Sequence, residues 1–495
     1  MKKTLFIKNA VILTVTGTIL RFLGIIFKVW LAGSIGSEGI GLYHIVFSLY
    51  TLASTFASSG ITIAVTRLCA DEQAIGNKKG IILIIRKATI IALSVAIFTF
   101  IFLIFGADFI SSKLLSDSRA AMSICVFAFS LPFMAVSSVV KGYFASRRKV
   151  WANSTAVLIE QIVRIVFCII FIKKLSVFGV AGAVAGVMAG DTLAEIVSCC
   201  YIYIMYTMDI KRVISENADN SFRRYAQLLR IAVPITFSRY AVSLLRTAEN
   251  IVVPKSLTKA GGDYSAALSI FGALKGMALP VLFFPSSLLN AFSSLLIPEM
   301  SEALVRNKPQ IIRGSVSKTL KTTWLMGVIF ACIFFFCGEK IGVFIYSDSD
   351  SGYLIHILAP LVPLMYLDSI SDGILKGLDK QLFTFRTSVI DSALRVLLIL
   401  VFVPRYSIDG FIVIMFASNI FTSFMNVGKV LSITEIKPKL FTTVLLPILS
   451  AAGITMLFCS LFSFISSTLI YILAVSVFSV LLYGGFVVCF GIWEQ

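Results

Sequence analysis

The sequence predicts an all-α integral membrane protein with 14 transmembrane helices. Of its 495 residues, 58% are hydrophobic and 14% are charged, whereas soluble domains carry about 25% charged residues. The mean hydropathy is +0.96. The hydrophobic runs suit helices that cross a bilayer, which need about 20 residues, and are too long for barrel strands of about 10. No polar block is long enough for a soluble catalytic domain, so we expect no enzyme activity.

Charge and cysteine content narrow the possible partners. The net charge of +18 would suggest nucleic acid in a soluble protein, but in a membrane protein lysines and arginines gather in loops as topology signals and contact anionic lipids. We therefore expect the protein to have membrane lipids as partners and not to bind nucleic acid. The nine cysteines are scattered in hydrophobic runs beside only two histidines, which predicts neither disulfides nor a metal site. No phosphate-binding loop signature is present, so we expect no cofactor.

The predicted spans follow one another through short polar loops. The first run begins after MKK, as a signal peptide does, but Arg21 interrupts it and favours an uncleaved helix. The fourteen spans cover residues 10–35, 40–64, 81–107, 120–144, 151–172, 176–208, 228–253, 265–297, 320–338, 353–375, 384–403, 409–430, 441–463 and 466–491.

The distribution of cations predicts the orientation. With the N-terminus inside and the spans alternating, 28 lysines and arginines fall on the inside, eight on the outside and seven within helices. Because cytoplasmic loops carry the excess of cations, we expect both termini in the cytoplasm of a multi-pass cell-membrane protein.

The chain also divides into similar halves. Glu160 and Arg164 stand four apart in the fifth span, as Asp391 and Arg395 do in the eleventh, and each pair can close on its own helix. The order of such matches predicts two six-helix lobes related by an axis along the membrane normal. We expect an N-lobe at 1–208, a cytoplasmic linker at 209–227, a C-lobe at 228–430 and two further helices at 431–495.

Cations inside the spans are the first candidates for a binding site. A charge at the bilayer centre costs at least about 2.5–3.5 kcal/mol, so such residues usually face a bundle interior or an aqueous cavity. Arg21 and Lys28 lie seven residues apart on one face of the first helix, and no acidic residue stands three or four positions from either, or from Lys275. With Arg246, they are predicted to bind an anionic substrate; structural pairing is the alternative.

Carboxylates inside the spans form two further pairs. Asp191 and Glu195 lie four apart in the sixth helix, and Asp368 and Asp372 do so in the tenth. They are candidates for binding a coupling proton or Na⁺. The alternative, that they only neutralise nearby cations, stays open.

Two stretches resemble a known family. Gly17-TILRFLGIIFKVWLAGSIGSEGIGLY and Gly60-ITIAVTRLCADEQAIGNKKG are similar to the stage V sporulation protein B branch of the polysaccharide transporter family, in the multidrug/oligosaccharidyl-lipid/polysaccharide flippase superfamily. The resemblance covers nearly the whole chain. It implies movement of lipid-linked sugars across the cytoplasmic membrane and, in Firmicute relatives, peptidoglycan work tied to the spore cortex.

The related lipid II flippases match in part. Arg21 corresponds to the first arginine of their Ser-Arg-x-Leu-Gly-Phe-x-Arg-Asp motif, whereas Phe27 and Lys28 replace its Arg-Asp end. Lys275-GMALP resembles their Arg-Leu-Met-Glu-Leu-Pro, and Ala53, Ser54 and Thr55 stand where they carry arginines. Two cavity arginines are thus missing, so the resemblance implies an undecaprenyl-diphosphate-type cargo without specifying lipid II.

We therefore expect a flippase that moves a polyprenyl-diphosphate-linked sugar by alternating access, with Arg21, Lys28, Arg246 and Lys275 holding the diphosphate. The main alternative is a cation-coupled multidrug antiporter of the same superfamily, whose cavity should be acidic. A membrane scaffold for envelope assembly is the third possibility and would need no buried charge. The oligomeric state is left open, with a monomer as the default expectation.

Overall fold

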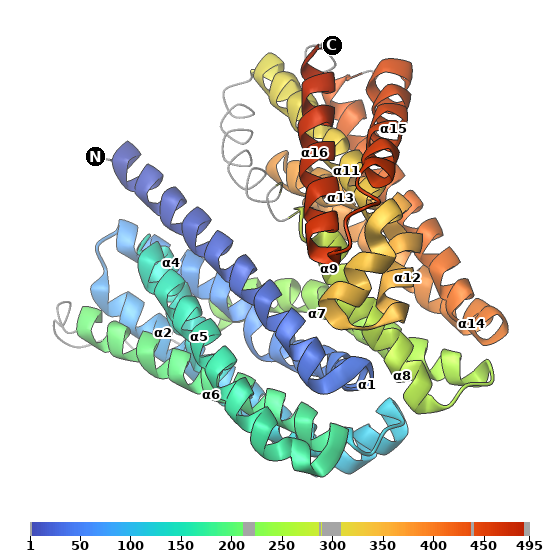
Figure 1. Cartoon of the computed structure of the whole chain (residues 1–495). Coiled ribbons are helices and arrows are strands. Elements are labelled where there is room, and N and C mark those ends of the chain that lie inside the picture. The colour runs from blue at the N-terminus through green and yellow to red at the C-terminus, as the bar shows by residue number, and fades with distance from the viewer. Residues whose placement is uncertain (1, 211–222, 287–288, 290–307, 437–439, 490–495) are drawn as a thin grey trace. The chain divides into compact units, whose positions relative to one another are not determined.

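The computed structural model describes residues 2–210, 223–286, 289, 308–436 and 440–489 (Figure 1). These residues are almost entirely helical and form no strand, so the all-α class is confirmed. Contacts divide the chain into two compact units. Unit 1 comprises Met1–Phe27 and Glu38–Ile251, and unit 2 comprises Lys28–Ser37 and Val252–Gln495.

Unit 1 is built from long helices and short turns. The chain turns at a π-helical segment after α2 and at a 3-10 turn between α5 and α6, and α3 and α4 form a pair bent by 42°. Its elements are α1 (Lys2–Ala74), α2 (Lys78–Phe109), η1 (Ile110–Leu115), α3 (Ala120–Ala128), α4 (Leu131–Ser146), α5 (Val150–Leu175), η2 (Ser176–Phe178), α6 (Gly179–Ile210) and α7 (Arg223–Lys259), whose last residues belong to unit 2.

Three of the helical stretches are much longer than one membrane crossing. α1 contains a kink at Gly36, where φ is 70°, a value that glycine adopts without steric penalty. A second stretch, Val150–Ile210, turns at η2, and α14 breaks at Ser407. The described residues hold ten helices, or eleven with the bent pair, that are long and apolar enough to span. The predicted number of fourteen therefore stays a prediction.

Glycines bring α5 and α6 together. A Cβ atom on Gly186 would lie 3.0 Å from backbone atoms of Phe171 and Ile172, and one on Gly190 would lie 2.7 Å from the backbone nitrogen of Cys168. The two ribbons run side by side in Figure 1. Small residues spaced by four allow such backbone approach within a membrane, and this contact positions the charged side chains described below.

Unit 2 contains the C-terminal half. Its elements are α8 (Tyr264–Gly272), η3 (Ala273–Ala278), α9 (Leu279–Phe283), α11 (Pro309–Tyr346), α12 (Ser349–Leu358), η4 (Ala359–Leu361), α13 (Val362–Gly377), α14 (Gln381–Thr434), η5 (Leu440–Leu445), α15 (Leu446–Leu461) and α16 (Thr468–Cys489). α11 is the central helix, because α12, α13, α15 and α16 all pack on it.

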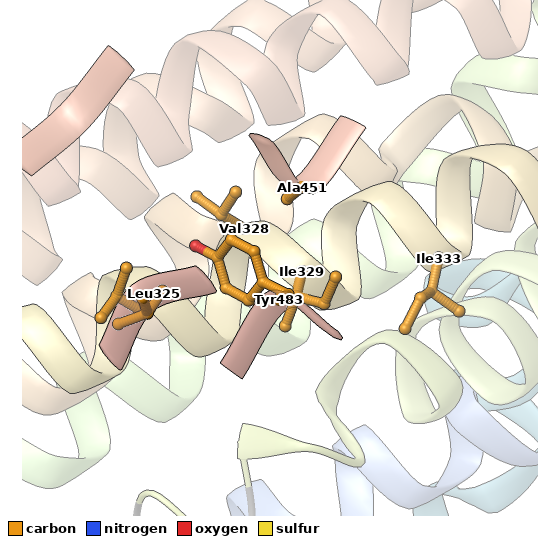
Figure 2. Close-up of a cluster of buried hydrophobic side chains, with 7 residues drawn as sticks. Leu325, Val328, Ile329, Ile333, Ala451 and Tyr483 are labelled. Carbon is orange, nitrogen blue, oxygen red and sulfur yellow. The ribbon is translucent and has the colours of Figure 1, made fainter. Parts of the chain in front are cut away.

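The last two helices pack along one face of α11. Their contact is a buried apolar cluster, shown in Figure 2, of Leu325, Val328, Ile329, Ile333, Ala451, Tyr483 and Val487. Other side chains of the pair, including Leu449 and Leu473, are exposed. We name α15 and α16 the tail hairpin. One face of the tail hairpin packs on α11, and its exposed apolar face is suited to contact with lipid.

The predicted linker at 209–227 lies mostly outside the described residues. The predicted lobe boundaries on either side of it, and the predicted orientation of the termini, therefore stay predictions.

Candidate functional site

A buried charged cluster joins α5 and α6 inside unit 1. Arg164 on α5 donates through Nε to Oδ1 of Asp191 on α6 at 2.6 Å, and through Nη2 to Oε1 of Glu160 at 2.8 Å. Its Nη1 donates to Oε1 of Gln161 at 2.7 Å. The planar guanidinium thus serves two carboxylates at once, as its geometry favours. The predicted pair of Glu160 and Arg164 is confirmed, and Asp191 joins it.

α4 extends this cluster by a second cation. The Nζ atom of Lys141 lies 3.7 Å from Oε2 of Glu160, and the Ser198 hydroxyl on α6 donates to the same oxygen at 3.4 Å. Glu160 therefore links three helices. Because removing one member of such a network leaves a charge uncompensated in an apolar setting, we expect these residues to act as a unit.

Glu195 is the exception in the cluster. It lies one turn beyond Asp191 on α6 and is 5% exposed, yet within the described residues no hydrogen bond or ion pair reaches its carboxyl group. Oδ2 of Asp191 is likewise buried without a hydrogen-bond partner there. With Glu160 the cluster holds three carboxyl groups, against two cations, Arg164 and Lys141. A fully ionised cluster would carry an excess negative charge.

Two tyrosines of α1 stand beside these acids. Tyr50 lies close enough to interact electrostatically with Glu195 and Asp191, and its hydroxyl donates to the sulfur of Met134 at 3.3 Å. Tyr43, the last residue of the motif EGIGLY, interacts electrostatically with Asp191 and Arg164. The motif that carries the family resemblance therefore reaches the charged cluster.

The same segment of α1 is fixed by a second ion-pair group. Arg119, in the turn before α3, donates through Nη1 to Oε1 of Glu38 at 2.7 Å and through Nη2 to Oδ2 of Asp117 at 2.8 Å. The hydrogen bonds that Arg119 donates to Asp117, and then the one that it donates to Glu38, raise the pKa of Arg119 above its usual value. Glu38 follows the Gly36 kink by two residues, so this pairing holds the start of the second half of α1.

The corresponding pair in unit 2 is simpler. Asp391 on α14 pairs with Arg395 one turn later, as predicted, and the Ser418 hydroxyl donates to its Oδ1 at 2.6 Å. Asp391 is 4% exposed. The two halves of the chain thus each hold an acid–arginine pair on one helix. In unit 1 the arginine is shared with Asp191, and in unit 2 Asp368 interacts electrostatically with Asp391.

The other two predicted coupling residues both have partners. Lys376 donates to Oδ2 of Asp372 at 2.5 Å, and Asn426 donates through Nδ2 to Oδ1 of Asp368 at 2.8 Å. Both carboxylates are partly exposed. The structure therefore brings Asp191 and Glu195 into one buried cluster. Asp368 and Asp372 each have a hydrogen-bond partner of their own, and Asp368 also interacts electrostatically with Asp372 and Asp391.

The four predicted substrate-binding cations lie on helices that are long and apolar enough to cross a membrane. Arg21 is half-buried on α1 and Arg246 is exposed on α7, both within unit 1. Lys28 is exposed on the next part of α1, and Lys275 is half-buried in η3, both within unit 2. Since the two pairs belong to different units, their convergence on one cavity stays a prediction.

Sequence comparison places this architecture in a family. The family model described as polysaccharide biosynthesis protein matches residues 6–304. The chain belongs to this family. The charged cluster of unit 1 and all four predicted substrate-binding cations lie within this matched range.

Curated relatives agree with this membership. The chain is 28% identical over 413 residues to stage V sporulation protein B of Bacillus subtilis, covering 82% of this chain and 80% of that protein. It is 21% identical over 427 residues to the lipid II flippase MurJ of Bacillus subtilis, covering 82% and 78%. The resemblance to the stage V sporulation protein B branch is thereby confirmed.

Solved structures show the same fold. A lipid II flippase MurJ in an inward closed conformation aligns with a TM-score of 0.70 at 15% identity, over 96% of this chain and 98% of that one. An inward-facing MATE family transporter of the MOP superfamily aligns with a TM-score of 0.65 at 12% identity, over 87% and 100%. The chain therefore has the fold of these membrane transporters, and its apolar helices together with its family make it a multi-pass membrane protein.

Sequence reasoning missed several members of the cluster. Lys141 counts as a loop cation by position, and Gln161 and Ser198 carry no signal of their own. Asp191 meets Arg164 across helices, a contact that the glycine spacing of α6 permits but does not specify. The pairing of Asp372 with Lys376 is the one that the spacing of four residues would have revealed.

Proposed function

We propose that the protein is a flippase that moves a polyprenyl-diphosphate-linked sugar across the cytoplasmic membrane by alternating access. The observation that carries this proposal is the position of Arg21, Lys28, Arg246 and Lys275 on apolar helices of a family whose relatives include a lipid II flippase. Cations at membrane depth are costly and usually mark a ligand path. A diphosphate has the complementary charge.

The division of charge within the chain supports an anionic cargo. In unit 1 the carboxylates gather around Arg164 and Lys141, and in unit 2 Asp391 gathers with Arg395. These acids are held by cations of their own unit on α4, α5 and α14, helices other than those that carry the four proposed cations. In this proposal the lobes rock about the bound headgroup, while the polyprenyl chain stays in the lipid.

We assign the coupling ion to the cluster of unit 1, and within it to Glu195. Asp368 and Asp372 have partners already, and Asp191 shares one oxygen with Arg164. Glu195 is buried and, in the part of the chain described, unpartnered, so binding a proton would remove its uncompensated charge. The groups that face it are Glu160 and Arg164 on α5, Lys141 on α4, Asp191 and Cys199 on α6, and Tyr50 on α1.

The test is a headgroup-accessibility assay in proteoliposomes that contain a defined polyprenyl-diphosphate sugar. The Arg246→Gln and Lys275→Gln variants are each expected to lower the rate of flipping at least tenfold, because a charge-assisted contact to phosphate is lost. Lys174→Gln, at an exposed position near the end of α5, is the matched control and should flip at the wild-type rate.

Other outcomes decide between the alternatives. Flipping at the wild-type rate by both charge-removing variants would overturn the assignment of the substrate site. Export of organic cations, with no movement of any polyprenyl-diphosphate lipid, would favour the multidrug antiporter. Flipping driven by an imposed Na⁺ gradient but not by a proton gradient would overturn the role of Glu195 as a proton acceptor.

A further inference from the structure

We propose that Cys337 and Cys459 form a redox-active thiol pair whose oxidation to a disulfide links the tail hairpin covalently to α11. The two sulfur atoms lie 4.0 Å apart in thiol contact. A disulfide joins sulfurs at about 2.05 Å, so the pair must close by about 2 Å. Rotation about the side-chain bonds of the two cysteines supplies movement of that size. The proposal does not depend on the cargo.

The pairing follows from the packing of two long helices. Ile329 and Ala451 belong to the buried cluster of Figure 2, and Cys337 and Cys459 follow them by eight residues each on α11 and α15. Equal offsets on both helices mean that the helices run in the same direction with the thiols at the same level. Eight residues correspond to about two helical turns, so the contact continues the helix interface.

The two thiols differ in access. Cys337 is fully buried, whereas Cys459 is half-buried and lies two residues before the end of α15. The Tyr471 hydroxyl, at the start of α16, donates to the carbonyl oxygen of Cys459 at 3.5 Å. The Lys340 ammonium lies 3.6 Å from the centre of the Tyr471 ring. A positive charge thus stands near Cys459, where it favours the thiolate form that reacts with oxidants.

The arrangement assigns an order to the reaction with a hydroperoxide as the oxidant. The Cys459 thiolate attacks the oxygen–oxygen bond of hydrogen peroxide, forming a sulfenic acid as that bond breaks and hydroxide leaves to become water. The Cys337 sulfur then attacks the sulfenic sulfur. The sulfur–sulfur bond forms, the sulfur–oxygen bond breaks and a second water leaves. The two thiols lose two electrons, and one peroxide is reduced to two waters.

The other cysteines provide an internal comparison. Cys332 lies on α11 only five residues before Cys337 and is half-buried as Cys459 is, but within the described residues it has no thiol contact. Cys332 therefore lies on the same helix as Cys337 and is about as buried as Cys459, but in the described part of the chain it lacks the neighbouring thiol that the pair provides. Cys332→Ser is the matched control.

The experiment uses the full chain in nanodiscs, treated with hydrogen peroxide, then unfolded and labelled with a maleimide that counts thiols. The reduced protein should show nine thiols and the oxidised protein seven, with the Cys337–Cys459 peptide pair found by mass spectrometry and lost on reduction. Cys332→Ser should still form this disulfide, whereas Cys337→Ala and Cys459→Ala should not.

Two results would overturn the proposal. Nine thiols after peroxide treatment, or disulfides only between other cysteines, would show that the contact is not redox-active. The peptide analysis of the wild-type chain decides this without any variant, so a substitution that prevents folding leaves the proposal testable. Retention of the crosslink in Cys332→Ser distinguishes the paired thiols from oxidation of α11 in general.

Discussion

The Nε atom of Arg164 lies 2.6 Å from Oδ1 of Asp191, a contact between α5 and α6 that the close approach of their backbones makes possible. Because Glu160 occupies another edge of the same guanidinium, the arginine is shared by two acids. The contact therefore contributes both to the packing of α5 on α6 and to the charge balance of the cluster.

The Arg164–Asp191 pair should show strong coupling in a double-mutant cycle. Arg164→Gln alone leaves the buried Asp191 and the half-buried Glu160 without their main cation, and removing one partner of a buried pair costs about 3–5 kcal/mol. Combining Arg164→Gln with Asp191→Asn should recover part of that loss. Thermal unfolding of the four proteins in one detergent measures the coupling, and simple additivity of the two losses would contradict it. Lys174→Gln serves as the exposed control.

Gly190→Ala should destabilise the α5–α6 contact. The added Cβ would lie 2.7 Å from the Cys168 backbone nitrogen and 2.9 Å from its Cα, so the helices must separate, at about 1–3 kcal/mol for an overpacked site. Gly453→Ala on α15 meets no atom within 4 Å and should be neutral or stabilising by up to about 1 kcal/mol, as alanine is the better helix former. Equal melting temperatures for the two variants would refute this account.

Glu195→Gln should abolish the dependence of flipping on a proton gradient while leaving the protein folded. The glutamine has nearly the same shape and carries no charge, so it mimics the protonated acid permanently. Transport driven by acidification of one side should fall toward the rate without a gradient. Asp372→Asn, which alters a carboxylate already paired with Lys376, is the control and should keep the dependence. A gradient response in Glu195→Gln equal to that of wild type would exclude the assignment.

Tyr483 offers a test of how the tail hairpin is held. Its ring is 4% exposed in the cluster on α11, whereas its hydroxyl has no hydrogen-bond partner within the described residues. Tyr483→Phe should therefore be neutral or slightly stabilising. Tyr483→Ala should cost up to about 3–5 kcal/mol, the value for large aromatics in packed cores. Limited proteolysis of the tail reports the difference, and Val488→Ala, at a position that is 75% exposed, is the control.

The sequence determined the class of this protein through properties that need no tertiary information. Hydrophobic runs of helical length specify membrane helices, because a bilayer leaves no other way to satisfy the backbone of such runs. The spacing of four residues likewise identified the pairs of Glu160 with Arg164 and of Asp391 with Arg395, since a helix brings such positions onto one face. The Gly17–Tyr43 and Gly60–Gly80 motifs indicated the family.

Tertiary structure decided which charges share a partner. Arg164 could satisfy Glu160 alone. The packing of α5 on α6 brings Asp191 to Arg164, and the packing of α4 on α5 brings Lys141 to Glu160. The same packing leaves Glu195 buried beside them without a hydrogen bond in the described chain. Contacts between helices depend on how two surfaces fit, whereas sequence spacing encodes only contacts along one helix. For that reason Asp191 and Glu195, which lie only four residues apart on α6, differ in the folded protein.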